Sequence, residues 1–205
     1  MKKFCKYSTL SVLIMMAFLT GQAQQKPVVK LGYSINTPVG TSFKNVISNT
    51  SFRGFNGELA YPVNSQVLVG LGVSYNDFYQ KYPRQVNATK YGDISAVISN
   101  SIQTTPVMAK VTYSFLKQGL LRPYAGLGAG VNFIRYNQYL GEFPDATSSV
   151  KPAMQADAGV NITLSKLRGT GINIGANFNY LPFNNDDVKN LNNWGIHAGI
   201  FFPLK

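Results

Sequence analysis

Large apolar residues occupy every second position in eight segments of the chain after residue 26. The clearest segment is 67–76, VLVGLGVSYN. Its odd-numbered residues are large and apolar, and from position 70 its even-numbered residues are glycine, serine or asparagine. A period of two places successive side chains on opposite faces of a β-strand. Each segment therefore predicts a strand with one apolar face and one face of small or polar residues.

The connections between these segments alternate in length. The predicted strands are residues 28–36, 53–61, 67–79, 105–115, 123–136, 153–164, 171–181 and 193–202. The long connections are 37–52, 80–103, 137–151 and 182–192, and the short ones are 62–66, 116–122 and 165–170. Transmembrane barrels have short periplasmic turns and longer external loops. The pattern predicts an all-β, eight-stranded, antiparallel up-and-down transmembrane β-barrel with four external loops and both termini periplasmic.

Alternation alone also fits a soluble barrel with its apolar face inward. Two observations favour the membrane. The polar face carries few charges, whereas a face in water normally carries many. Aromatic residues of the apolar face gather near the strand ends, as in the interface belts of membrane barrels. The outer belt contains Phe55, Tyr75, Tyr79, Phe133, Tyr180 and Trp194. The periplasmic belt contains Tyr61, Tyr113, Phe115 and Phe202.

The first 23 residues have the pattern of a cleaved secretory signal. Three lysines precede the apolar run 10–20, LSVLIMMAFLT, which is too short to cross a bilayer as a helix. Small residues at 21–23 then offer a cleavage site after Ala23. The alternative is an N-terminal membrane anchor. The lone cysteine, Cys5, leaves with the signal, so the barrel domain, residues 24–205, has no thiol chemistry.

The mature chain is basic, with sixteen lysines and arginines against eight acidic residues. An exported chain rarely meets nucleic acid, so we expect no nucleic-acid partner. Anionic lipid headgroups at the membrane surface are the expected counterpart of this charge. The alternative is that the charge serves only the solubility of the loops.

Three stretches of the sequence are distinctive: Gly57-Glu58-Leu59-Ala60-Tyr61 before a tight turn, the run 122–131, RPYAGLGAGV, and the aromatic-rich final strand. Together they resemble the OmpA/OmpX/OmpW-like family of small outer-membrane barrels. The resemblance covers about all of the mature chain and implies the same fold. It also implies recognition by the barrel-assembly machinery, which reads a terminal aromatic residue in many such barrels. Here Phe202 is followed by Pro203-Leu204-Lys205, so that signal is offset.

Four charged residues and the single histidine are predicted to face the lumen. They are Lys30, Glu58, Lys110, Asp157 and His197. Isolated buried charges are costly, so these charges must be paired or solvated. We expect a salt-bridge plug, with Glu58 beside Lys110 or Lys30 and Asp157 beside the remaining lysine. Closure of the first strand on the last also brings Lys30 towards His197. The alternative is a gate whose pairs exchange partners and admit ions.

The sequence offers no recognisable catalytic, cofactor or metal site. His197 has no serine two residues on, as a lipid-hydrolysing site at the rim would need. One histidine and scattered acids do not make a metal ligand set, although Asp145 and Asp186-Asp187 could contact a cation weakly. The run Gly126-x-Gly128-x-Gly130 lies in a predicted strand without a following helix, so it is no dinucleotide fingerprint.

Arg135 is predicted to point outwards at the external end of its strand. We expect it to contact anionic outer-leaflet glycolipid together with the loop bases Lys44, Lys81 and Arg84. The alternative is an interface side chain that extends to the headgroups without a specific role.

The pattern as a whole favours a non-enzymatic, monomeric outer-membrane barrel with a structural or surface-interaction role. Its expected partners are outer-membrane lipid and the barrel-assembly machinery, and a protein partner stays unidentified. Two other functions remain open: a narrow porin-like channel for ions or small solutes, and an accessory subunit of an outer-membrane assembly.

Overall fold

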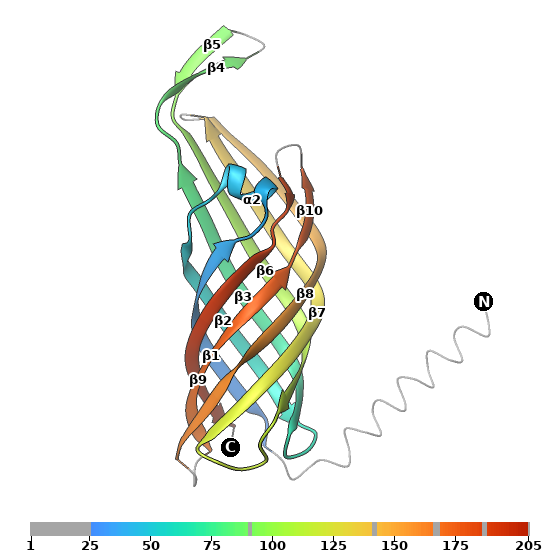
Figure 1. Cartoon of the computed structure of the whole chain (residues 1–205). Coiled ribbons are helices and arrows are strands. Elements are labelled where there is room, and N and C mark those ends of the chain that lie inside the picture. Colours follow the sequence, from blue (N-terminus) through green and yellow to red (C-terminus); the bar gives the residue numbers. More distant parts are fainter. Residues whose placement is uncertain (1–25, 90–91, 141–142, 166–168, 186–187, 205) are drawn as a thin grey trace, which may run out of the picture.

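Eight strands close into an antiparallel barrel in the computed structural model of the chain (Figure 1). The structure describes residues 26–89, 92–140, 143–165, 169–185 and 188–204. The barrel strands are β1 (Val28–Pro38), β2 (Ser51–Pro62), β3 (Val67–Lys81), β6 (Ile98–Ser114), β7 (Leu121–Leu140), β8 (Phe143–Ser165), β9 (Thr170–Tyr180) and β12 (Asn193–Pro203). Each strand pairs with its neighbours along the chain, and β1 closes the ring on β12. The predicted eight-stranded up-and-down barrel is confirmed.

The alternation in the sequence becomes the inside and the outside of this barrel. Along β1, Leu31 and Tyr33 are exposed on the outer wall, whereas Ser34 and Asn36 are buried in the lumen. The other strands follow the same rule, so the large apolar residues form the wall and the small or amide residues form the interior. Any slip of one residue in the pairing would exchange the two faces, which fixes the register.

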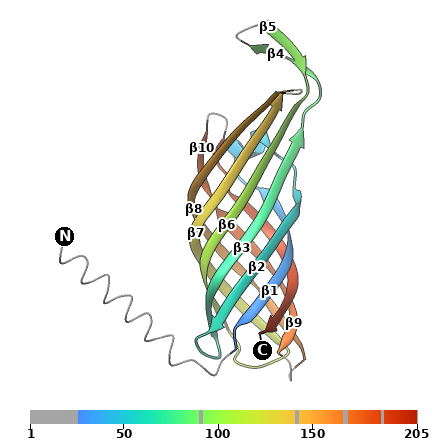
Figure 2. The same ribbon diagram turned by 180° about the vertical axis from the view of Figure 1, so that it is seen from behind.

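The two ends of the barrel differ, as Figures 1 and 2 show. At one end, called the turn end here, short connections join β2 to β3, β6 to β7 and β8 to β9. The first and last described segments meet there, where the backbone amide of Leu204 donates to the carbonyl of Pro27 at 2.8 Å. The opposite end, called the loop end, carries α2 (Thr41–Val46) and the two hairpins β4–β5 and β10–β11.

The loop end is more ordered than the sequence pattern predicts. Strands β7 and β8 remain paired up to Leu140 opposite Phe143, so the predicted loop 137–151 is wrong for most of its length. Backbone pairing continues there although the strict alternation of large apolar and small residues does not, because the ladder hydrogen bonds join main-chain groups whatever the side chains. The other long connections hold α2, the hairpin β4 (Gln85–Thr89) with β5 (Gly92–Ala96), and the hairpin β10 (Pro182–Asn185) with β11 (Val188–Asn190).

An apolar cluster, called the loop-end core, closes the barrel beneath α2. Along the lumen-facing positions, Asn76 is followed by Phe78, and Thr104 is preceded by Ile102. Phe43 of α2 packs edge to face on Phe78, with 5.1 Å between the ring centres. The loop-end core consists of Phe43, Val46, Ile47, Phe78, Ile102, Met108, Ile134, Tyr136, Ala153, Leu181, Phe183, Val188 and Leu191. Within the described residues, no helix is long and apolar enough to cross a membrane.

Candidate functional site: the charged lumen and the outer wall

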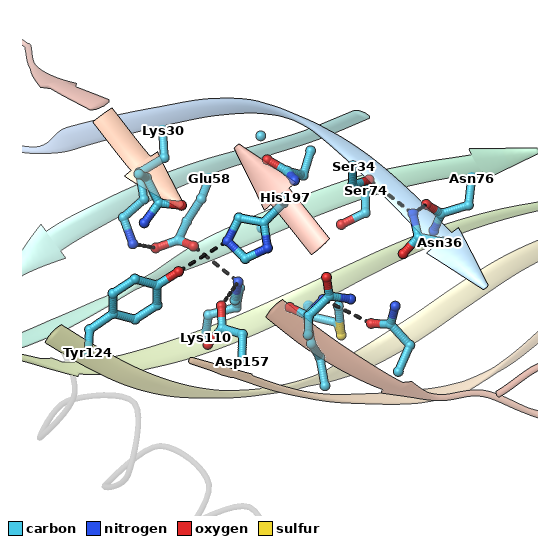
Figure 3. A pocket seen from close by; sticks show the side chains of 18 residues that line it. Lys30, Ser34, Asn36, Glu58, Ser74, Asn76, Lys110, Tyr124, Asp157 and His197 are labelled. Atoms are coloured by element: carbon cyan, nitrogen blue, oxygen red, sulfur yellow. Dashed lines mark hydrogen bonds and ion pairs between the residues drawn. The ribbon is translucent and has the colours of Figure 1, made fainter. Parts of the chain in front are cut away.

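The four predicted lumen charges meet in one chain of ion pairs, called the lumen charge network (Figure 3). Lys30 Nζ lies 2.8 Å from Glu58 Oε1, and Lys110 Nζ lies 3.2 Å from Glu58 Oε2. Lys110 Nζ also lies 3.0 Å from Asp157 Oδ2. Glu58 therefore pairs with both lysines, whereas the sequence pattern predicts one or the other. Lys110 in turn pairs with two carboxylates. Charges alternate along the chain, and its net charge is zero.

Strand register and glycine positions make this network possible. Lys30 lies directly opposite Glu58 in the β1–β2 pair. Lys110 reaches Glu58 across β3 because Gly72 leaves the space: a Cβ there would lie 2.7 Å from Lys110 Cδ. A Cβ at Gly126 would collide with the carboxylate of Asp157. Because these glycines have no side chains, they leave room for the charged side chains to extend across the lumen.

Burial makes the pairing obligatory. The four side chains are between 7% and 12% exposed. Removing ions from water costs several kcal/mol each by order of magnitude, and only close, well-directed partners offset this. Loss of Glu58 would therefore leave Lys30 buried and unpaired, and loss of Lys110 would do the same to Asp157. The charged interior of the barrel therefore requires these ion pairs for its stability.

Tyr124 joins the predicted His197 to the network. The Tyr124 hydroxyl and His197 Nε2 lie 3.1 Å apart, and Lys30 Nζ lies 5.6 Å from the centre of the Tyr124 ring. Tyr124 was not among the predicted lumen residues. Its even-numbered position, in step with Gly126 and Gly128, was the signal that would have placed it inside.

Amide side chains fill most of the remaining lumen. Asn36 Nδ2 donates to Asn76 Oδ1 at 2.6 Å, and Gln155 Nε2 donates to Asn179 Oδ1 at 2.9 Å. The cavity left beside the charge network measures about 40 Å³. At 10–15 Å³ for each probe-sized site, it has room for on the order of three waters. The described interior around the charge network is therefore closely filled.

The described residues hold no group of three or more histidine, cysteine, aspartate or glutamate side chains that could bind a metal ion. His197 bonds to a phenol, and no serine is bonded to it among the described residues. Asp145 is exposed at the loop end, and the predicted weak cation contact at Asp186-Asp187 lies outside the described residues. The charged side chains of the lumen are held as ion pairs.

Arg135 lies on the outer wall among neutral polar residues. It is opposite Gln103 on β6 and Ser148 on β8, and these three line a hollow of about 480 Å³. Phe133 and Val150 line the apolar side of this hollow. The other predicted bases are exposed near the loop end but do not line it; they are Lys44, Lys81 and Arg84.

The predicted interface aromatics lie on the outer wall. Phe55, Tyr61, Tyr75, Tyr79, Tyr113, Phe115, Phe133, Tyr180 and Trp194 are exposed, and Phe202 is half-buried. Phe55 pairs with Tyr75 across β2 and β3. Further towards the loop end, Arg53 binds Asp77 at 3.1 Å and stacks over Tyr79. Arg53, Asp77 and Arg135 each lie two residues beyond an aromatic residue of the outer belt on the loop-end side, namely Phe55, Tyr75 and Phe133.

Comparison with known proteins is consistent with this geometry. The sequence model of one family, described as "Outer membrane protein beta-barrel domain", matches residues 9–202. The crystal structure of Neisserial surface protein A superposes with a TM-score of 0.56 at 16% identity, covering 88% of this chain and 97% of that one. OprG from Pseudomonas aeruginosa gives 0.57 at 12% identity, covering 88% and 96%. Such identities show the fold alone. No match is found among curated protein sequences.

Proposed function

Since the chain belongs to the family of outer membrane protein beta-barrel domains, we propose that it is a closed, non-enzymatic barrel of the outer membrane that presents its loop end as an interaction surface. In this proposal the loop end lies outside the cell and the turn end in the periplasm. The division of the connections into short turns and long structured loops supports this orientation. The barrel itself serves as the anchor.

The double closure of the lumen carries this proposal. The lumen charge network fills the middle of the barrel and leaves about 40 Å³ beside it. The loop-end core then seals the external mouth with fully buried side chains such as Phe43 and Phe78. A solute would have to displace an ion-paired layer and an apolar layer. The described part of the loop end, in contrast, exposes polar side chains such as Lys44, Asn45 and Lys189.

Bilayer conductance separates this proposal from the narrow channel. We expect the refolded mature protein to show no discrete openings in a planar bilayer, while its gel mobility shifts on boiling as for a folded barrel. Openings whose size changes in Glu58→Gln and Lys110→Gln, but not in the outer-wall variant Arg53→Gln, would instead establish a channel through the lumen.

Labelling on intact cells tests the orientation. A single cysteine is placed at exposed Lys189 of the loop end or at exposed Lys117 of the turn end. A membrane-impermeant thiol reagent is expected to label Lys189→Cys on whole cells, and Lys117→Cys only after lysis. The reverse pattern would contradict the proposed orientation.

Biogenesis and oligomeric state complete the proposal. We propose that the barrel-assembly machinery inserts the chain and that the protein is a monomer, since the ring closes within one chain. Light scattering of the detergent-solubilised protein, corrected for bound detergent, measures its mass. A mass of two or more chains, or a co-purified outer-membrane complex, would favour the role of an accessory subunit.

A further inference from the structure

Most of the net positive charge of the mature sequence lies in the segments that connect or flank the strands at the turn end. In the sequence these segments are 24–29, 62–66, 116–122, 165–170 and 202–205, and they contain no aspartate or glutamate. Their basic residues are Lys26, Lys117, Arg122, Lys166, Arg168 and Lys205. The loop-end segments hold eight basic and six acidic residues, and the lumen holds two of each. An unmatched field of one sign raises the local concentration of anions at this end.

A pocket of about 260 Å³ opens within this charged end, inside the mouth of the barrel. Lys30, Lys117 and Arg122 line it, and none of the described residues that line it is acidic. Glu58 lies deeper, and its two oxygens already bind Lys30 and Lys110. The charges of Lys117 and Arg122 are therefore left without a counter-ion among the described residues.

Arg122 lacks an acceptor. Its Nε atom is buried without a hydrogen-bond partner, and no described residue forms a hydrogen bond or an ion pair with its side chain. A guanidinium keeps its charge at any physiological pH, and a buried donor without an acceptor is costly. The planar fork of arginine matches the two oxygens of a carboxylate or phosphate. The acceptor that completes this site is thus an oxyanion.

The other residues that line the pocket indicate what kind of ligand bears the oxyanion. Gln66 and Asn161 place amide groups in the pocket, and Phe201 provides an apolar surface. The volume is below the roughly 300–1,000 Å³ of pockets that enclose whole small molecules. The pocket therefore suits the end group of a larger ligand. Arg122, Asn161 and Phe201 belong to the lumen-facing side of their strands, so the opening follows the barrel axis, away from the lipid-facing wall.

We propose that this turn-end pocket binds a carboxylate of an acidic peptide on the periplasmic side, with Arg122 and Lys117 as the anion-binding residues. The proposal rests on the orientation proposed above only for the compartment of the ligand. Amide groups beside the two cations suit a peptide backbone, which a lipid headgroup does not present.

The test uses the mature protein in nanodiscs of zwitterionic lipid, where both ends are accessible whatever the orientation in the cell. The probe is a C-terminally amidated tripeptide of glutamate with a neutral fluorophore on its N-terminus, and the matched control is the same labelled and amidated tripeptide of glutamine, which has no carboxylate. Anisotropy is expected to show binding of the acidic probe alone. Arg122→Gln is expected to weaken binding at least tenfold, Lys117→Gln up to about fivefold, and Lys189→Gln at the loop end not at all.

A second readout follows Arg122 itself. The Nε–H signal of Arg122 in ¹⁵N–¹H spectra is expected to shift on adding the acidic probe, in the wild type and in Lys189→Gln. Equal binding by wild type and Arg122→Gln, or by both probes, would overturn the site. Displacement of the probe by millimolar phosphate or by phosphatidylglycerol, with the same shift at Arg122, would overturn the peptide in favour of a phosphate ligand. None of these outcomes depends on the thiol-labelling result.

Discussion

Glu58 occupies a position that no neutral residue can fill. Each of its carboxylate oxygens accepts from a different lysine, at 2.8 and 3.2 Å. Lys30 has this carboxylate as its described ionic partner, whereas Lys110 has a second one in Asp157. Each buried charge of the lumen thus has a specific partner of opposite sign. Changing a single charge is therefore expected to change the stability of the barrel.

Replacing Glu58 by glutamine tests this balance. Glu58→Gln leaves Lys30 buried without an anion, and we expect a loss of about 3 to 5 kcal/mol in the free energy of unfolding. Arg53→Gln breaks the more exposed pair with Asp77 and is the matched control, with an expected loss of about 1 kcal/mol or less. Urea unfolding in lipid vesicles measures both. Equal losses in the two variants would contradict the structural role of the network.

Strand parity found the charged residues of the lumen but missed its large apolar ones. Lys30, Glu58 and Asp157 stand out because charges are rare on the small-residue face. Tyr124 and Phe201 share that face, yet an aromatic residue in a membrane strand is first assigned to the wall. Only the position, counted from neighbouring glycines, distinguishes them. The exact partners could not be predicted, because they depend on how far each lysine extends across the glycine gaps.

The short helix α2 is held by the loop-end core rather than by its own sequence. It has six residues, and no side chain caps its N-terminus. Isolated helices of this length are not stable in water. Phe43 and Val46, both buried, attach it to the barrel mouth. The helix is therefore expected to form only when the barrel has closed beneath it.

Truncation of Phe43 tests this dependence. Phe43→Ala removes a fully buried ring and should cost about 3 kcal/mol locally, which corresponds to roughly hundredfold faster amide exchange in residues 39–50. The heat-dependent gel shift of the barrel is expected to persist. Hydrogen-exchange mass spectrometry measures the change, with exposed Asn45→Ala as the control. Unchanged exchange in Phe43→Ala would show that α2 is stable without the core.

Element boundaries at the loop end illustrate what a periodic pattern cannot predict. Residues 137–151 do not continue the alternation of large apolar and small residues, so the pattern predicts a loop there. Backbone pairing nevertheless extends β7 and β8 through most of that segment. The pattern identifies strands that have one apolar face, and it misses strands in which apolar residues are irregularly spaced. The membrane-spanning part was predictable for the same reason that this extension was not.

Across the whole molecule, the balance of basic and acidic residues changes along the barrel axis. In the sequence, the loop-end segments are nearly balanced, the four lumen charges cancel, and every charged residue in the segments that connect or flank the turn-end strands is basic. On the outer wall, Arg135 is an exception to the neutral lining of its hollow. This location is consistent with contact to the phosphate of an outer-leaflet glycolipid, as the sequence suggested, although without the three loop bases.

Lipid retention measures that contact. We propose that Arg135→Ala lowers the phosphorylated glycolipid retained by the purified protein by roughly fivefold, the effect of about 1 kcal/mol for one charge near a headgroup. Lys189→Ala, at the loop end but outside the hollow, should retain the wild-type amount. Phosphate analysis of the extracted lipid gives the ratio. Equal retention in the two variants would leave Arg135 as an interface residue without a specific lipid.

The pairing of β1 with β12 also determines when the barrel can close during export. β1 is the first strand to be synthesised and β12 the last, yet they pair along their whole length, from Val28 opposite Pro203 to Pro38 opposite Asn193. Until the final segment has been exported, the first strand keeps an unpaired edge, which hydrocarbon does not tolerate. Insertion of the strands into lipid one at a time would therefore leave this edge exposed unless another protein covered it. Each exported chain therefore needs the edge of β1 protected until its own β12 has also been exported.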